Sequence, residues 1–429
     1  MPTRQWLAYG LFGLPLAMAA LPVYVHVPRL YADAGINLAL LGGLLLATRL
    51  LDAGIDPLLG WWADRTPRRS RLVVVALPFL AAGMLLLLNP ASAGSSPPLL
   101  WLTVALIATY FGFSLASVAY QAWGAEIGRD SGERTLLTAS REGFGLFGVI
   151  LASLLPLLLA ADTAAGLARL SWLFVPLLVL AAVVTVLGAA GDRRRLARVD
   201  PSRPATPPAS LATLRHAFRD RRFVRLVGIF LLNGIAAALP ATLVLFFVAD
   251  VLAAEAMSGI FLALYFVAGV AGLPLWVFLA RRIGRIRAWL VSMAVACIAF
   301  VFALSLGAGD VAAFAAVCLL TGLALGADLA LPPALLADIA ESPMASAGAG
   351  GYFGWWNLIA KLNLALAAGL ALPLLALLGY EPGGDARGGT GGDAGLQALA
   401  LVYCLLPVFF KAAAATLAWR WRNELEVCS

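Results

Sequence analysis

The sequence predicts an all-α membrane protein in which twelve transmembrane helices form two six-helix halves, and three observations support this fold class. Hydrophobic residues make up 62% of the 429 residues and charged residues 12%, whereas soluble domains average roughly 45–50% apolar and about 25% charged residues. The apolar residues fall into runs of the roughly 20 residues that cross a bilayer. Arginines gather in alternate breaks between these runs. The composition excludes a secreted enzyme, a disordered tail protein and a nucleic-acid-binding protein.

Each apolar run is an expected transmembrane helix, and polar or Pro- and Gly-rich breaks separate the runs. The first run is too long for the apolar region of a signal peptide and further spans follow it, so we expect it to be retained. The twelve expected spans are residues 6–27, 37–62, 72–90, 99–125, 144–161, 169–190, 225–249, 257–280, 288–306, 311–337, 351–378 and 396–419.

A polar stretch divides the spans into two sets of six. Residues 1–190 are the predicted N-terminal half, 225–429 the C-terminal half, and 191–224 the linker between them. The prolines of the linker disfavour helix. Ten arginines lie from Arg193 to Arg225, which makes this the most basic break in the chain.

The placement of the arginines predicts the topology. They cluster in the breaks after spans 2, 4, 6, 8 and 12, while the alternate breaks carry only Arg29, Arg169 and Arg387. The positive-inside rule then puts both termini and the linker in the cytoplasm. We expect a monomer in the bacterial inner membrane whose partners are the lipid bilayer and a small-molecule solute, with no nucleic acid.

Two six-span halves joined by a basic linker are typical of the major facilitator architecture, in which the substrate site lies near the midplane of the bilayer. The segment Gly60-Trp61-Trp62-Ala63-Asp64-Arg65-Thr66-Pro67-Arg68-Arg69 resembles the loop signature G-x-x-x-D-R-x-x-R-R of that superfamily. Asp64 at a helix end can pair with arginines and with the N-terminus of a neighbouring helix, and so latch one conformation. The alternative is a merely basic loop. A degraded copy, Ala280 to Arg285, occupies the corresponding place in the second half.

Span 2 carries three ionisable residues, Arg49, Asp52 and Asp56, whose spacing places them on one helical face. A charge inside a membrane span is by default a functional hypothesis. Two carboxylates one turn apart resist ionising together. Arg49 can neutralise one of them, which leaves a site for Na⁺, Li⁺ or H⁺, and Pro57 frees a backbone carbonyl as a further ligand. The alternative is a buried structural ion-pair triad.

The run Arg-x-x-Asp-x-x-x-Asp-Pro-x-x-Gly from Arg49 to Gly60 resembles the glycoside-pentoside-hexuronide:cation symporters of the major facilitator superfamily. Tyr9-Gly10, the segment 120–141 and Ala337-Asp338 extend this resemblance over most of the chain. The resemblance implies that Asp52 and Asp56 are the cation-binding pair. It further aligns Ser114 with a cation-site hydroxyl, Arg141 with a substrate-binding arginine after a one-residue gap, and Lys361 with a lysine near both sites.

The chain also departs from that family. Pro15 and Ser117 stand where the family has two sugar-binding aspartates, and Gln121 stands at a tryptophan position. Carboxylates that accept paired hydrogen bonds from hydroxyls are strong specificity elements, so the identity of the solute stays open. Ile55 replaces an asparagine beside the cation site, which favours H⁺ over Na⁺.

Other polar and aromatic residues in the spans are candidate substrate contacts, although ordinary packing explains many such aromatics. Asp328 is expected either to pair with Lys361 or to contact substrate. Lys411 is expected to extend towards the cytoplasmic surface. The candidate contacts are Tyr120, Gln121, Trp123, Arg141, Asn233, Asp328, Trp356, Asn357 and Lys361.

These residues predict a cation-coupled secondary transporter that moves a small solute, of sugar or glycoside type, by alternating access. Two alternatives are a transporter of a non-sugar solute such as a lysolipid or another amphiphile, and a non-transporting membrane receptor. Recognised nucleophile, zinc, phosphate-loop and haem motifs are absent from the sequence, so we expect no enzyme. We also expect no cofactor, and no metal beyond a possible coupling Na⁺ at Asp52 and Asp56.

Overall fold

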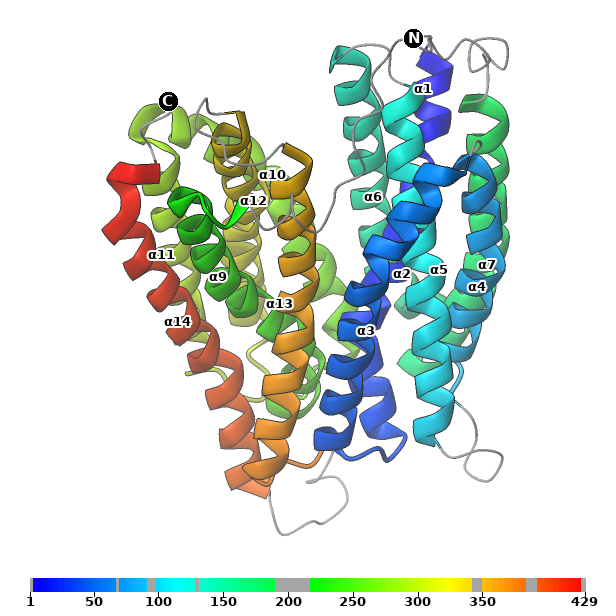
Figure 1. The fold of residues 1–429 in the computed structure, drawn as a ribbon. Helices are drawn as coiled ribbons and strands as arrows, with labels where there is room; N and C mark the ends of the chain where they lie inside the picture. The colour runs from blue at the N-terminus through cyan, green and yellow to red at the C-terminus, as the bar shows by residue number, and fades with distance from the viewer. Residues whose placement is uncertain are drawn as a thin grey trace, which may run out of the picture. The chain divides into compact units, whose positions relative to one another are not determined.

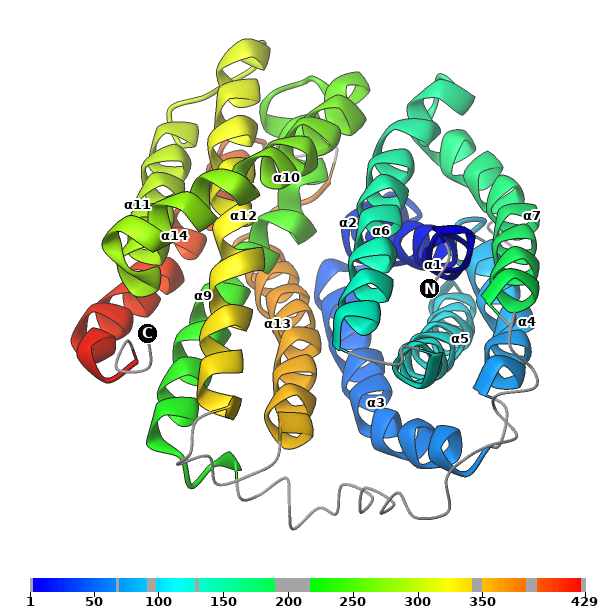
Figure 2. The same cartoon turned by 90° about the horizontal axis from the view of Figure 1, so that it is seen from above.

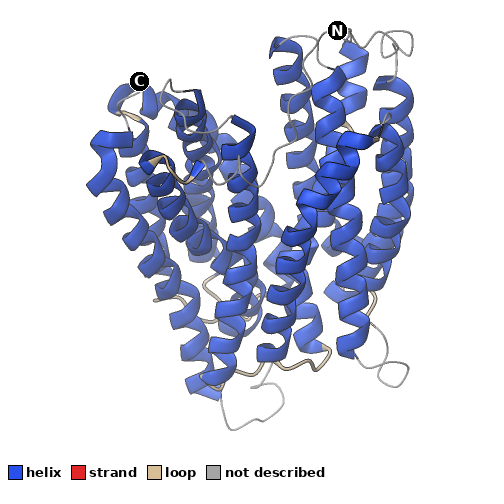
Figure 3. Ribbon diagram, viewed as in Figure 1, coloured by secondary structure: helices blue, strands red, loops and turns tan. Residues whose placement is uncertain are grey.

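The computed structural model describes residues 3–66, 69–90, 98–127, 131–189, 217–341, 349–382 and 392–425, and its regular elements in these ranges are all helices (Figure 3). Twelve of the segments are long and apolar enough to cross a membrane, which confirms the predicted fold class and number of spans. α1 and α2 together make the first span. The predicted linker lies mostly outside the described residues. The helices of the first part of the chain are α1 (Thr3–Gly10), α2 (Gly13–Asp33), α3 (Leu38–Arg65), α4 (Arg69–Leu87), α5 (Pro98–Ile127), α6 (Ser131–Leu159) and α7 (Thr163–Ala189).

The second part of the chain is helical in the same way (Figure 1). Its α9 continues into a short π-helical turn, and a 3₁₀ turn precedes α10. Several of its helices contain proline, which membrane helices tolerate because neighbouring groups satisfy the freed backbone atoms. The elements are α9 (Arg221–Phe246), η1 (Phe247–Val251), η2 (Glu255–Met257), α10 (Ser258–Ile283), α11 (Arg285–Ala303), α12 (Val311–Glu341), α13 (Ala349–Leu377) and α14 (Gly392–Leu425).

The chain forms two compact units, and their boundaries cut through α2 and α3. Unit 1 comprises Met1–Val23 and Thr48–Pro208, and unit 2 comprises Tyr24–Ala47 and Ala209–Ser429. The second half of α2 and the first part of α3 therefore belong with α9 to α14.

In unit 1 the most extensive helix contact is that of α4 with α5 (Figure 2), and α1 packs against α6 and α7. Glycine permits the close approach of α4 and α5. A Cβ added at Gly112 would lie 2.4 Å from the backbone nitrogen of Leu80. Small residues allow helix backbones to come close in membranes, where packing rather than water exclusion holds helices together.

In unit 2, α10 packs against α12, and α9 packs against α14 and α13. Asp220 caps the start of α9 by accepting a hydrogen bond from the Arg222 amide at 2.9 Å. Gly284 separates α10 from α11 with a φ of +91°, a conformation that glycine adopts without strain. Since α11 also packs against α12 and α14, the four helices α9, α11, α12 and α14 surround one buried polar cluster.

Large apolar side chains cover much of the outside of both units. Leu158 in unit 1 is 78% exposed and Leu377 in unit 2 is 85% exposed. Since the spans are membrane-length helices, such residues are suited to lipid contact.

Candidate ion and substrate sites

The structure brings Arg49, Asp52 and Ser114 together inside unit 1. Ser114 of α5 donates a hydrogen bond from Oγ to Asp52 Oδ1 at 2.5 Å. Arg49, three residues before Asp52 on α3, places Nη1 3.6 Å from Asp52 Oδ2. The Asp52 side chain is only 2% exposed, and the Arg49 guanidinium lies over the Tyr110 ring at 4.5 Å. A buried carboxylate thus has a cation and a hydroxyl beside it, which offset the high cost of removing its charge from water.

Asp56 lies one helical turn beyond Asp52 on the same helix, and its side chain is half-buried. Residues four apart on a helix are neighbours on one face. The predicted carboxylate pair is therefore in place on α3, with Asp52 the more deeply buried member.

The loop signature is described only in part. Gly60, Asp64 and Arg65 belong to α3, but the side chains of Asp64 and Arg65 and the whole of Arg68 lie outside the described residues. Arg69 begins α4 and donates from Nη1 to the Ala122 carbonyl at 2.8 Å, so it fixes the start of α4 to α5. The latch expected of Asp64 stays a prediction.

The degraded copy of this signature contributes an ion pair to unit 2. Arg285 at the start of α11 pairs with Asp338 near the end of α12. The same guanidinium lies 3.4 Å from the Ala334 carbonyl. Asp338, which the sequence only marks as the end of a span, therefore joins two helices.

The candidate contacts on α5 belong to an aromatic cluster in unit 1. The Tyr9 hydroxyl donates to the Tyr120 carbonyl at 3.0 Å, and the Tyr120 hydroxyl donates to the Tyr9 carbonyl. The two rings stack with centroids 4.4 Å apart, and the Trp123 ring lies 6.2 Å from that of Tyr9. Tyr120 and Trp123 are buried, whereas Gln121 is exposed. In this structure the two aromatic side chains hold α1 against α5.

The Arg141 side chain on α6 is half-buried and pairs with its neighbour Glu142, with Arg141 Nε 3.1 Å from Glu142 Oε1. On α13, Trp356 stacks on Phe230 of α9 at a centroid distance of 3.6 Å. Asn357 is exposed and Lys361 is half-buried. These predicted substrate contacts therefore lie on two units, with Arg141 on unit 1 and Trp356, Asn357 and Lys361 on unit 2, and their role in binding a solute stays a prediction.

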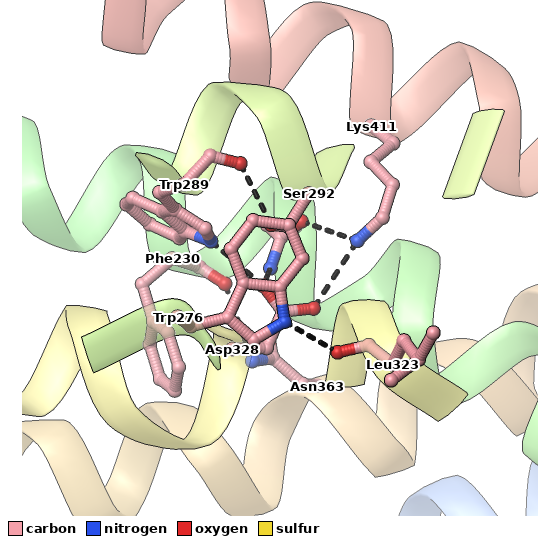
Figure 4. A network of polar contacts seen from close by, with 9 residues as sticks. Phe230, Trp276, Trp289, Ser292, Leu323, Asp328, Asn363 and Lys411 are labelled. Carbon is pink, nitrogen blue, oxygen red and sulfur yellow. Dashed lines mark hydrogen bonds and ion pairs between the residues drawn. The ribbon is translucent and has the colours of Figure 1, made fainter. Parts of the chain in front are cut away.

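A buried polar network joins α9, α11, α12 and α14 of unit 2 (Figure 4). Asp328 Oδ1 accepts hydrogen bonds from Asn233 Nδ2 at 2.9 Å and from Trp289 Nε1 at 2.7 Å. Asp328 Oδ2 lies 3.2 Å from Lys411 Nζ, and Lys411 Nζ also donates to Asn233 Oδ1 at 2.7 Å. Asp328 lies on α12, Asn233 on α9, Trp289 on α11 and Lys411 on α14.

This network corrects two predictions. The partner of Asp328 is Lys411, not Lys361, and Lys411 does not extend to the membrane surface, since its side chain is 5% exposed. The physical reason is that α14 packs against α9 and α11, so the ammonium points into the bundle, where a carboxylate and an amide oxygen compensate its charge. Trp289, which lies in an apolar run and carries no motif in the sequence, is a further member of the network.

A second cluster that the sequence did not predict lies at the end of α2 within unit 2. Arg29 forms a two-pronged pair with Asp250, at 2.7 Å from Nη1 to Oδ2 and 3.1 Å from Nη2 to Oδ1. The Tyr380 hydroxyl, just after α13, donates to the same carboxylate. Burial and the negative charge of Asp250 both raise the pKa of Tyr380. Arg29 thus ties α2 to η1.

Within the described residues, twelve membrane-length helices with charged groups paired inside them define a polytopic membrane protein. Solved transporters share this fold along nearly the whole chain. The nucleoside transporter NupG is 13% identical, with 99% of each chain covered and a TM-score of 0.71. A bacterial homologue of the human lysosomal transporter Spinster is 16% identical, covering 99% of this chain and 96% of that one, with a TM-score of 0.70. A bacterial homologue of the iron transporter ferroportin is 18% identical, covering 99% of this chain and 100% of that one, with a TM-score of 0.61.

The family model described as MFS/sugar transport protein matches residues 6–423, and the chain belongs to this family. The protein is therefore an integral membrane transporter of the major facilitator superfamily and not an enzyme. It moves a small solute by alternating access.

Proposed function

We propose that this transporter couples solute movement to a cation that binds at Asp52 and Asp56. The observation that carries the proposal is the geometry of Asp52, a carboxylate 2% exposed inside a membrane helix bundle, with Ser114 Oγ 2.5 Å away and Arg49 Nη1 3.6 Å away. A charge kept in such a place despite its cost favours a role in ion or substrate movement. The resemblance of span 2 to the glycoside-pentoside-hexuronide:cation symporters supports the same role.

The arrangement favours H⁺ over Na⁺ as the coupling ion. The positive charge of Arg49 beside Asp52 opposes the approach of a metal cation. A proton needs only one carboxylate oxygen, whereas a metal ion needs several oxygen ligands, and the nonpolar Ile55 supplies none. Protonation of Asp52 would weaken its hold on Arg49. Coupling follows if protonation of Asp52 shifts the conformational equilibrium of the transporter towards the state that binds solute.

The proposed solute is a sugar or a glycoside-like compound, in keeping with the family. Pro15 and Ser117 in place of two aspartates indicate that such a solute is held by contacts other than paired carboxylate bonds. A second candidate is a more apolar amphiphile, which a largely apolar cavity in unit 2 favours. We place the protein in a bacterial inner membrane with both termini cytoplasmic, from the distribution of arginine.

The test of cation binding needs no knowledge of the solute. The melting temperature of purified protein is recorded across pH values with and without NaCl, because a ligand that binds only the folded state raises it. We expect the change in melting temperature with pH or NaCl to be smaller in Asp52→Asn than in the wild type, because a neutral amide cannot bind the coupling cation. Asp52→Glu, which keeps a carboxylate, should retain the dependence, and Asp310→Asn, at an exposed aspartate, should match the wild type. An unchanged pH dependence in Asp52→Asn would refute the site.

A further inference from the structure

The cluster of Arg29, Asp250 and Tyr380 joins three spans that are far apart in the sequence. Arg29 lies near the end of the first span, Asp250 at the end of the seventh and Tyr380 just after the eleventh. Two hydrogen bonds, of 2.7 and 3.1 Å, join the Arg29 guanidinium to the Asp250 carboxylate. The two side chains are 12% and 10% exposed. A two-pronged pair so well shielded from water is a strong and geometrically specific contact.

The proposed topology puts this cluster at the outer end of unit 2. The breaks after spans 1, 7 and 11 belong to the set that carries few arginines. The positive-inside rule assigns that set to the side away from the cytoplasm. The cluster therefore lies at the end of the spans opposite the basic breaks.

The path of α2 relates the cluster to alternating access. Met1–Val23 belongs to unit 1, whereas Tyr24–Ala47, which includes Arg29, belongs to unit 2. Arg29 is thus part of the first six spans by sequence and packs with the last six. In alternating access these two sets of spans move relative to each other. A contact between the first and the seventh span at their outer ends is one that this movement would separate.

Each member of the ion pair has a second polar contact that such a separation would keep. Arg29 Nε lies 3.0 Å from Asp33 Oδ2, one turn further along the same helix. Asp250 also accepts a hydrogen bond from the Tyr380 hydroxyl, which belongs to the last six spans as Asp250 does. Separating a buried ion pair is costly when a charge is left uncompensated. Here both charges keep a partner, so the cost of breaking the pair is lower.

The backbone around Asp250 is irregular. α9 ends in the π-helical turn η1, Phe247–Val251, and Ala253 follows with a φ of +51°. A residue with a side chain rarely adopts this left-handed conformation. π-helical turns are frequent at functional sites, and strained backbone is found in segments that switch conformation. These features favour a conformational role for the segment that carries Asp250.

From these observations we infer that Arg29 and Asp250 form a lock that holds the outer side of the transporter closed, and that Asp33 retains Arg29 when the lock opens. Tyr380 holds Asp250 in both states. The lock rests on the proposed topology but needs no cation at Asp52, so it can stand or fail without the cation site.

Opening of the outer side is measured by the labelling rate of a cysteine placed below the lock. Val25 lies one helical turn before Arg29 on α2 and is 1% exposed, so Val25→Cys is shielded while the lock holds. The four native cysteines are replaced by alanine. A membrane-impermeant maleimide is then added outside right-side-out membrane vesicles of the expression host.

Ala308→Cys tests the topology separately, because Ala308 is exposed in the turn after the ninth span. We expect this cysteine to label readily in the same vesicles. Labelling of Ala308→Cys only after the vesicles are opened would put this end of the spans in the cytoplasm. That result would overturn an outer lock together with the proposed topology, and it would leave the cation site untouched.

Two substitutions should change the labelling rate of Val25→Cys in opposite directions. Asp250→Asn removes the charge of the lock and leaves Arg29 paired with Asp33, so it should raise the rate at least about tenfold, as expected for lost hydrogen bonds between charged groups. Asp33→Asn removes the partner of Arg29 in the open state and should lower the rate about two- to fivefold. Asp310→Asn, at an exposed aspartate on the same side, should leave it unchanged.

The opposite signs distinguish a lock from a purely structural cluster, in which both substitutions would loosen the packing and speed labelling. Size-exclusion profiles check that the variants fold. Arg29→Lys provides a second variant, because lysine keeps the charge but cannot form the two-pronged contact, and it should also speed labelling. An unchanged rate in folded Asp250→Asn and Arg29→Lys would overturn the lock. A rate that is not lowered in folded Asp33→Asn would overturn the role of Asp33.

Discussion

Replacing Lys411 by methionine removes the positive member of a buried ion pair and leaves Asp328 charged inside unit 2. The Lys411 side chain is 5% exposed and that of Asp328 is 13% exposed, so water reaches neither freely. Breaking a buried pair by removing one partner typically costs about 3–5 kcal/mol, because the remaining charge is uncompensated. Trp289 and Asn233 still donate hydrogen bonds to the carboxylate, so we expect a cost at the lower end of this range. We expect Lys411→Met to lose about 3 kcal/mol of unfolding free energy.

The assay is equilibrium unfolding in mixed micelles of a mild detergent and SDS, followed by the fluorescence of the buried Trp289 and the other tryptophans. Asp328→Asn/Lys411→Met provides the comparison, because replacing both charges with neutral groups is often close to neutral in stability. The double variant should therefore be more stable than Lys411→Met. Arg281→Met, at an exposed basic residue in the last turn of α10, controls for the loss of a positive charge as such. A loss below about 1 kcal/mol in Lys411→Met, or a double variant no more stable than the single one, would show that the Lys411 charge does not stabilise Asp328.

Three further predictions concern unit 1 and the end of α2. Ser114→Ala removes the donor to Asp52 Oδ1 and should cost about 1–3 kcal/mol in the same unfolding assay, whereas Ser153→Ala, which loses only a bond to its own helix, should cost less. Gly112→Ala, whose new Cβ would meet the Leu80 nitrogen, should destabilise by roughly 1–3 kcal/mol, while Gly143→Ala, with open space around it, should not. The raised pKa of Tyr380 means that above pH about 10 the unfolded chain loses this proton before the folded protein does, so stability falls with rising pH. Tyr380→Phe should reduce that fall between pH 10 and 11, as measured by melting temperature, and an identical slope in the variant would contradict the assignment.

The spans could be predicted because composition alone determines which segments suit a bilayer. The sequence could also place Arg49, Asp52 and Asp56 on one helical face, because their spacing follows the helical period. The contact of Asp52 with Ser114, 62 residues away, depends on how α3 and α5 pack. Periodicity within one helix carries no information on that packing, and only the family resemblance indicated the contact.

Lys411 shows how a prediction can fail for a reason visible in the sequence. It lies nine residues before Arg420 in α14, which at about 1.5 Å per residue puts it roughly 13 Å from the basic end of the helix. That depth exceeds the reach of a lysine side chain. The choice of Lys411 rather than Lys361 as the partner of Asp328 depends on helix rotation, which these nearly uniform apolar runs do not reveal.

A cation that binds at Asp52 moves charge inside the membrane, and this charge movement can be measured. Proteoliposomes on a solid-supported membrane are exposed to a rapid pH step, and the transient current that follows cation binding is recorded without any solute. We predict a transient current in the wild type and in Asp52→Glu, and none in Asp52→Asn reconstituted at equal density. A wild-type current that persists unchanged in Asp52→Asn would show that the cation binds elsewhere.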